Sequence, residues 1–299
     1  MSDAWLDRVQ RVRRWTRGGV RAPHKPLLLL LMLGRIQHER FGLVPFSDVE
    51  ASLEALLRDF GPTRSKYEPS YPFHHLATDG LWEVRDRAGA DGRYLGTARA
   101  RLRAEALGRL DPSFEAALRA DPQLLAASAR ALLDANFPPS LHADILARTG
   151  LDPEPLEGPI AGKGGRRRDP GFRDRILVAY EYRCAMCGFD GWLAGEAIGL
   201  DAAHVRWWNI GGPDEVANGL ALCTLHHRLF DRGVLGLAAD GTVMVSQLFV
   251  GRETSARRLV LDLVGQPALL PQAPHPPVAA QHREWHSMQV FRSPARGAA

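Results

Sequence analysis

Cysteine is scarce in this chain, with three in 299 residues. So few thiols cannot build a disulfide framework, and we expect reduced cysteines in a cytoplasmic protein. Long apolar runs are also lacking, because the longest, residues 27–33, is far shorter than the roughly 20 residues that cross a bilayer. The N-terminus carries charges in place of the apolar segment of a signal peptide. We therefore expect neither a disulfide-rich secreted protein nor a membrane partner.

The composition is that of a globular protein. Hydrophobic residues make up 45% of the chain and charged residues 24%, which leaves ample apolar material for a core. The net charge of +4 is modestly basic and gives only weak support for a nucleic-acid partner. A length of 299 residues predicts two domains.

A basic stretch rich in proline and glycine divides the chain. Residues 1–150 show helical patterns with short extended pieces, and they predict a mostly helical first domain. Residues 151–168 lack apolar periodicity and are interpreted as a linker. Residues 169–299 predict a second domain that ends in a loosely packed tail rich in proline and glutamine. The predicted fold class is α+β.

Local patterns place the elements that carry the polar residues of interest. In the first domain, the apolar run after Pro26 predicts a buried helix. In the second domain we expect a helix over 171–182, a strand over 197–205 and a helix over 216–233.

The three cysteines have the spacing of a zinc site. Cys184-x-x-Cys187 places two thiolates on one tight turn, and Cys223-x-x-His226 supplies two further ligands three residues apart. Together they predict a closed Cys3His structural Zn²⁺ site that leaves no thiol over. Three unrelated small core residues are the alternative interpretation.

His226 is followed directly by a second histidine, His227. Neighbouring residues on a helix point about 100° apart, so the two side chains cannot serve one site equally. If His226 binds zinc, His227 is available for a second site. Upstream, His204 ends the predicted strand, and Asn218 lies near the start of the predicted helix.

The order of these residues resembles the HNH (ββα-metal) nucleases. The resemblance covers about residues 169–236 and rests on the C-x-x-C pair, "DAAH", "NGLALC" and "HH". It implies metal-dependent hydrolysis of a phosphodiester, with His204 as the base that takes a proton from water. It also implies that Asn218 fixes the loop and that His227 binds a catalytic divalent ion, Mg²⁺, Mn²⁺ or similar.

One position departs from the family pattern. Many relatives carry an acid directly before the first histidine, where this chain has Ala203. Asp201 is the nearest carboxylate and the candidate second ligand of the catalytic ion, although a strand directs it to the face opposite His204. In the alternative interpretation, Asp201 caps a turn.

The first domain has a basic N-terminal segment. Seven basic residues stand against two acidic ones between residues 1 and 25, which fits a phosphate-facing surface or a solvated helix. The basic residues are Arg8, Arg11, Arg13, Arg14, Arg17, Arg21 and Lys25.

A second unusual stretch, "YPFHHL", begins at Tyr71. Together with "RAPHKP" it resembles the sulfur-binding domain found ahead of HNH modules in type IV restriction enzymes, and the resemblance covers most of residues 1–150. Those enzymes cut DNA in which sulfur replaces a non-bridging phosphate oxygen. The resemblance implies that Tyr71 and Pro72 form the wall of a sulfur pocket. Further DNA contacts are expected from His24, Lys25, Arg21, Phe73, His75, Arg99 and Arg101. An ordinary turn before a strand is the plain interpretation of "YPF".

Such a pocket has a physical basis for selectivity. Sulfur is larger and more weakly hydrated than oxygen, so an apolar pocket desolvates it at little cost. The same pocket strips water from a charged oxygen without replacing its hydrogen bonds, which costs on the order of a few kcal/mol.

The sequence therefore predicts a modification-dependent restriction endonuclease that acts on double-stranded, phosphorothioated DNA. A homodimer would allow both strands to be cut. One alternative is an HNH endonuclease that reads a methylated or otherwise modified base, which would require a deeper aromatic cage. Another is a zinc-stabilised DNA-binding protein without nuclease activity, against which the complete set of H, N and H argues.

Overall fold

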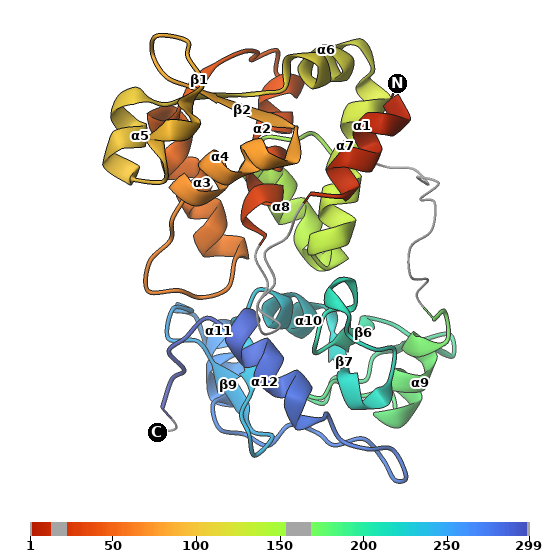
Figure 1. Cartoon of the computed structure of the whole chain (residues 1–299). Coiled ribbons are helices and arrows are strands. Elements are labelled where there is room, and N and C mark those ends of the chain that lie inside the picture. The colour runs from red at the N-terminus through yellow and green to blue at the C-terminus, as the bar shows by residue number, and fades with distance from the viewer. Residues whose placement is uncertain (1, 13–22, 154–168, 298–299) are drawn as a thin grey trace. The chain divides into compact units, whose positions relative to one another are not determined.

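The structure, a computed structural model, describes residues 2–12, 23–153 and 169–297. The chain divides into two compact units, Met1–Gly162 and Lys163–Ala299, and each is described by itself. Helices dominate the first unit, whereas the second combines helices with short β-hairpins (Figure 1). The predicted α+β class and the mostly helical first domain are confirmed. Among the helices of the described residues, none combines the length and apolar character needed to span a bilayer.

The first unit contains a small antiparallel sheet of order β1-β3-β2, formed by Val44–Pro45, Leu107–Leu110 and Trp82–Arg85. Its helices are α1 (Ser2–Gln10), α2 (His24–Gln37), α3 (Phe46–Phe60), α4 (Ser70–His75), α5 (Arg99–Glu105), α6 (Pro112–Ala120), α7 (Pro122–Asn136) and α8 (His142–Thr149).

Helix α2 is the predicted buried helix, and it packs against α3, α4, α6, α7 and α8. Its apolar run covers every side of the helix, so Leu27, Leu30 and Leu33 are all buried. His24 and Lys25 form the first turn of α2, and Lys25 contacts Thr78 and Asp79, which follow α4, the helix that carries Tyr71.

The second unit contains three hairpins in the described residues: β4 (Trp192–Leu193) with β5 (Glu196–Ala197), β6 (Leu200–His204) with β7 (Gly219–Cys223), and β8 (Leu235–Leu237) with β9 (Val243–Val245). The helices are α9 (Phe172–Ala179), α10 (Thr224–Asp231), α11 (Thr254–Leu259) and α12 (Ala280–Gln289).

The helix predicted over 216–233 is only partly correct. Gly219–Cys223 forms strand β7, which pairs with β6 in the register Ala203↔Leu220, and the helix begins at Thr224. Residues 219–222 are all buried, and a short, fully buried run does not distinguish a strand from a helix by periodicity. Gly219 is also required for packing, because a Cβ there would lie 2.2 Å from Cδ1 of Ile176 in α9.

The C-terminal tail is not loosely packed as predicted. It contains α12, whose residues Trp285 and His286 are buried, and α12 packs against β8. Val290 and Phe291, just after the helix, are also buried. The sequence did not predict this packing, because the apolar residues of the segment are widely spaced among prolines and glutamines.

The predicted linker lies mostly outside the described residues, at 154–168. Of its described part, Leu151 is buried and its amide donates to the carbonyl of Leu146. The amide of Asp152 donates to Oε1 of Gln37. These residues therefore belong to the packing of the first unit.

Candidate functional site

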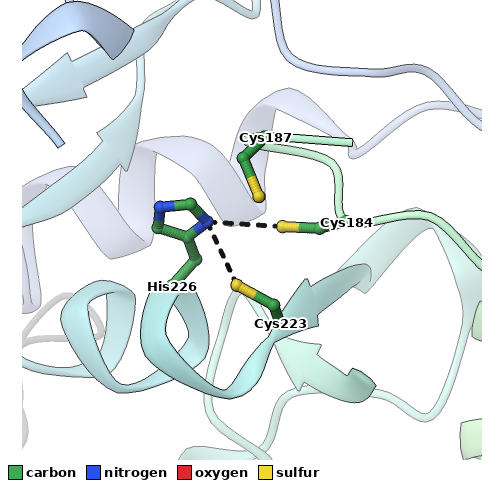
Figure 2. A group of neighbouring side chains, drawn as sticks. All are labelled: Cys184, Cys187, Cys223 and His226. Atoms are coloured by element: carbon green, nitrogen blue, oxygen red, sulfur yellow. Dashed lines mark hydrogen bonds between the residues drawn. The ribbon is translucent and has the colours of Figure 1, made fainter. Parts of the chain in front are cut away.

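The three cysteines and His226 converge on one point in the second unit (Figure 2). Cys184 and Cys187 come from the loop after α9, Cys223 from the end of β7, and His226 from the first turn of α10. Their ligand atoms all lie within 4.8 Å of one another, and a tetrahedral zinc with Zn–S bonds of roughly 2.3 Å would set sulfurs about 3.8 Å apart. The group therefore fits a zinc site, as predicted.

His226 directs one ring nitrogen toward the sulfurs and the other away from them. Its Nδ1 lies 3.4 Å from Sγ of Cys184 and 3.3 Å from Sγ of Cys223. Its Nε2 lies 2.7 Å from the carbonyl oxygen of Leu259, an acceptor that orients a metal-binding imidazole. Burial alone would lower the pKa of His226, but its hydrogen bonds to the two sulfurs raise it to about 10. A zinc ion would replace that proton.

The cysteine thiols also interact with one another. Hydrogen bonds with Cys187 and Cys223 lower the pKa of the Cys184 thiol although the residue is buried. The same contacts raise the pKa of Cys187, so in the ion-free protein the cysteines share their protons, which a bound metal would displace.

His204 ends strand β6, where its ring is held from two sides. Its Nε2 lies 2.7 Å from Oδ1 of Asp214, and the ring stacks on Phe172 with centroids 4.0 Å apart. Asp214 also accepts hydrogen bonds at Oδ2 from the indole of Trp208 at 3.2 Å and from the amide of Asp169 at 3.1 Å. The histidine predicted as the base therefore has a fixed orientation.

Asn218 is fully buried and clamps the loop between β6 and β7. Its Oδ1 accepts from the amide of Arg206 at 2.8 Å, and its Nδ2 donates to the carbonyls of Arg206 and Pro213 at 3.0 and 2.9 Å. Gly212 allows the tight loop path, because a Cβ there would lie 1.7 Å from the carbonyl oxygen of Arg206. Asn218 thus fixes the loop that carries Asp214.

His227 lies between two carboxylates. Its Nδ1 is 3.4 Å from Oδ2 of Asp201, and its Nε2 is 3.3 Å from Oδ2 of Asp231. Burial would lower the pKa of His227, but hydrogen bonds to the two aspartates raise it to about 10. In turn, the hydrogen bond from His227 lowers the pKa of Asp201 despite partial burial. Imidazole and carboxylate so close together are a fitting ligand pair for a divalent ion.

Three residues that contact the two histidines were not predicted as site residues: Asp214, Asp231 and Phe172. Asp231 follows His227 by four positions on α10, a spacing that places them on one face of a helix and could have been noticed. Asp214 lies in an irregular loop ten residues after His204, and no local pattern pointed to it.

In the first unit, the predicted sulfur-binding residues differ in their accessibility. Tyr71 is 52% exposed, and its ring stacks with that of the exposed His75 at a centroid distance of 6.1 Å. Pro72 is buried, so the expected open wall made by both residues reduces to Tyr71. The prediction for Phe73 is wrong, because its side chain is fully buried and packs edge-on against Phe46 and Trp82.

The cations predicted to contact DNA are mostly paired within the domain. Lys25 lies 2.5 Å from Oδ2 of Asp79, with 16% of the lysine side chain exposed. His24 is half-buried beside it. Arg21 lies outside the described residues.

Arg99 is likewise neutralised, by ion pairs with Glu50 and Glu54. Its predicted contact with DNA would have to form beside these ion pairs, with 26% of the arginine side chain exposed. Arg101 is more accessible, with 45% of its side chain exposed, and its guanidinium lies 5.3 Å from the centroid of the Tyr94 ring.

Family models match both units. Residues 2–154, about half of the chain, match the ScoMcrA-like DNA sulfur-binding domain. The chain belongs to this family. Residues 184–238 match the HNH endonuclease model, which covers the Cys3His group and the predicted catalytic residues. The chain thus combines a DNA sulfur-binding domain with a metal-dependent HNH endonuclease domain, the pairing that the sequence predicted.

Solved structures give weaker likenesses to this ScoMcrA-like chain. The sulfur-binding domain of SprMcrA complexed with phosphorothioated DNA is 25% identical, with a TM-score of 0.42, over 50% of this chain and 94% of that one. The phosphorothioation-dependent type IV restriction endonuclease ScoMcrA is 25% identical, with a TM-score of 0.41, over 53% of this chain and 36% of that one. These scores are low, and the assignment rests on the family models. No curated protein matches the chain.

Proposed function

We propose that the first unit docks on a phosphorothioate through Tyr71 and that the second unit hydrolyses a nearby phosphodiester with His204 as the base. The observation that carries this proposal is the joint occurrence, in one chain, of an exposed tyrosine in a sulfur-binding domain and a rigidly held histidine in an HNH domain.

Hydrolysis begins with the activation of water. His204 accepts the proton of a water molecule aligned with the phosphorus, and the resulting hydroxide attacks the phosphorus. The ester P–O bond opposite the hydroxide breaks, and the departing strand oxygen takes a proton from solvent. Asp214 then stabilises the protonated imidazole at 2.7 Å. Asn218 contributes by holding the loop that carries Asp214, and it need not touch the DNA.

The catalytic ion is proposed to bind between His227 and Asp201, with Nδ1 and a carboxylate oxygen as ligands. Such an ion, Mg²⁺ or Mn²⁺, supplies positive charge for the developing negative charge on the phosphate. His227 is held for this role by Asp231 at its other nitrogen. The Cys3His group is proposed to hold a structural Zn²⁺ that fixes α10 to the loop after α9.

Sulfur recognition is proposed to combine an aromatic face with a small apolar floor. Tyr71 offers its exposed ring, and the floor is assigned to Pro72, which follows it in α4 and is buried. His75 stacks beside the tyrosine and can contact an adjoining phosphate, as can His24 at the start of the neighbouring helix α2. Lys25, already paired with Asp79, adds little net charge there, which suits a weakly hydrated atom better than an oxyanion.

We further propose residues 1–150 as the recognition domain, 151–168 as the connection and 169–299 as the nuclease domain. A proline- and glycine-rich connection predicts cleavage at some distance from the modification, with a loose offset. Because each chain has one nuclease site, a homodimer would cut both strands.

The deciding experiment is a cleavage assay on three duplexes of one sequence that carry a phosphorothioate, an unmodified backbone or 5-methylcytosine, each with Mg²⁺, Mn²⁺ or no added ion. The proposal requires ion-dependent cleavage of the phosphorothioated duplex alone. Cleavage of the methylated duplex alone would establish a base-reading enzyme, and binding without cleavage under all conditions would establish a DNA-binding protein.

A further inference from the structure

Trp207 and Trp208 lie side by side after β6, and each donates its indole hydrogen to a different aspartate. Nε1 of Trp208 lies 3.2 Å from Oδ2 of Asp214. Nε1 of Trp207 lies 3.0 Å from Oδ1 of Asp231. Both carboxylates are withdrawn from solvent, with 12% and 2% of their side chains exposed. The tandem tryptophans therefore act as more than packing residues.

Each of these aspartates contacts a histidine with its second oxygen. Oδ1 of Asp214 lies 2.7 Å from Nε2 of His204, and Oδ2 of Asp231 lies 3.3 Å from Nε2 of His227. The arrangement of tryptophan, aspartate and histidine thus occurs twice, and both histidines are contacted at Nε2. Because the two ring nitrogens point in different directions, each Nδ1 is directed away from its aspartate.

We propose that Asp214, braced by Trp208, is a positioning residue that keeps the imidazole proton of His204 on Nε2. An ionised carboxylate accepts hydrogen bonds and donates none, so the nitrogen that faces it must carry the proton. The lone pair of His204 is then on Nδ1. This inference rests on the proposed function in one respect, the role of His204 as the base. It deepens that function by naming Nδ1 as the atom that takes the proton from water.

The surroundings of Asp214 support an ionised carboxylate in a fixed orientation. Burial alone would raise the pKa of Asp214, but hydrogen bonds from the amide of Asp169 and from His204 lower it. The amide of Asp169 and the indole of Trp208 both point at Oδ2, which leaves Oδ1 for His204. Phe172 lies against the imidazole with an angle of 17° between the ring planes and prevents the ring from turning.

This arrangement makes Asp214→Asn an informative variant. Two N–H donors face the Oδ2 position, so the single oxygen of the asparagine must occupy it. The amide NH2 group then faces Nε2 of His204 and can only donate to it. The imidazole proton must move to Nδ1, the nitrogen proposed to receive the proton from water. The substitution therefore inverts the tautomer while conserving size and the two other hydrogen bonds.

Two readouts test the proposal on the full chain. The ¹⁵N chemical shifts of the His204 ring should place the proton on Nε2 in the wild type and on Nδ1 in Asp214→Asn. The kcat for phosphorothioated duplex should fall about 10⁴-fold, the loss that a tautomer inversion of this kind causes in serine-protease triads, with little change in KM. Asp214→Glu should retain the Nε2 proton and recover part of kcat. Asp174→Asn, an exposed change on α9 with 81% of its side chain accessible, is the matched control and should change neither readout.

The outcomes separate this proposal from the proposed function. If the His204 proton stays on Nε2 in Asp214→Asn, the proposal is overturned, whatever the activity. If the tautomer inverts and cleavage continues at the wild-type rate, the tautomer assignment stands and the role of His204 as the base is refuted. If Asp214→Asn fails to fold, Trp208→Phe is the second variant, because it removes only the hydrogen bond from the indole to Asp214. It should keep the proton on Nε2 of His204 and lower kcat roughly 10-fold, the effect of one hydrogen bond. An unchanged kcat would overturn the bracing role of Trp208.

Discussion

Tyr71 in the first unit and His204 in the second are the residues proposed for recognition and for catalysis, and their surroundings differ. Tyr71 is 52% exposed and contacts a histidine that is itself exposed. His204 is contacted on its edge by Asp214 and on its face by Phe172. Catalysis requires a nitrogen held in one position, whereas sulfur recognition requires an accessible apolar surface.

The two units also use their charges differently. In the second unit, aspartates hold the histidines of the site. In the first unit, acids neutralise the cations near the predicted DNA contacts, as Asp79 does for Lys25 and Glu50 for Arg99. The comparison teaches that the aspartates of the second unit orient histidines, whereas the acids of the first unit balance two of its cations, and the following experiments test both halves.

The largest effect is expected for Cys223→Ser. Loss of one thiolate weakens zinc binding, whose free energy is folding free energy in such sites, so the second unit should lose several kcal/mol of stability or fail to fold. Released zinc is measured with a chelating dye and unfolding by thermal denaturation. Met288→Ala, at a residue 63% exposed, is the control. A wild-type protein that contains no zinc would refute the assignment.

His204→Ala should abolish the chemistry while leaving recognition intact. Removal of a general base costs about 10²–10⁴-fold in rate, and the DNA affinity should stay within about twofold because the first unit is unaltered. Single-turnover cleavage and equilibrium binding are measured in parallel, with His275→Ala as the control. Unchanged cleavage would remove His204 from the mechanism.

Asn218→Ala tests the loop clamp. Two buried carbonyls and one amide lose their partner, so the variant should lose about 2–4 kcal/mol in the free energy of unfolding. Asn209 is the matched control, because its buried side-chain amide has no hydrogen-bond partner among the described residues, and Asn209→Ala should cost much less. Urea denaturation compares the two, and equal losses would argue against the clamp.

The ion at His227 should compete with a proton. The pKa of His227 is raised to about 10. Its ion pairs therefore stabilise the ion-free protein fully at pH values below the ordinary histidine pKa, and this stabilisation is lost as the pH rises through about 10. Since the ion needs a neutral imidazole, Mn²⁺ affinity should rise by about tenfold per pH unit between neutrality and that pKa. Calorimetry at several pH values measures this, with His227→Gln as the comparison. An affinity independent of pH would place the ion elsewhere.

The zinc site was predictable from the sequence because its four ligands form two pairs with fixed local spacing. The order of His204, Asn218 and His227 was equally visible. Asp214 was not, because its contact with His204 depends on the path of an irregular loop that Asn218 fixes. The helix predicted over 216–233 begins at Thr224 for a related reason, since the buried run Gly219–Cys223 pairs with β6 as a strand.

In the first unit, the buried helix α2 followed from its apolar run, but side-chain accessibility did not follow from the motifs. Tyr71, Pro72 and Phe73 are consecutive, yet the first is exposed and the other two are buried, because the turn of α4 directs them to different sides. Likewise, nothing in the sequence indicated that Glu50, 49 residues away, pairs with Arg99.

The most direct test of sulfur recognition is equilibrium binding of the full chain to two duplexes that differ by one sulfur atom, measured for the wild type, Tyr71→Ala and Tyr94→Ala. Tyr94 is 56% exposed and serves as the matched control. A desolvation difference of a few kcal/mol predicts that the wild type and Tyr94→Ala prefer the sulfur duplex by about 10–100-fold. In Tyr71→Ala this preference should shrink toward unity while affinity for the plain duplex stays the same. An unchanged preference in Tyr71→Ala would contradict the account.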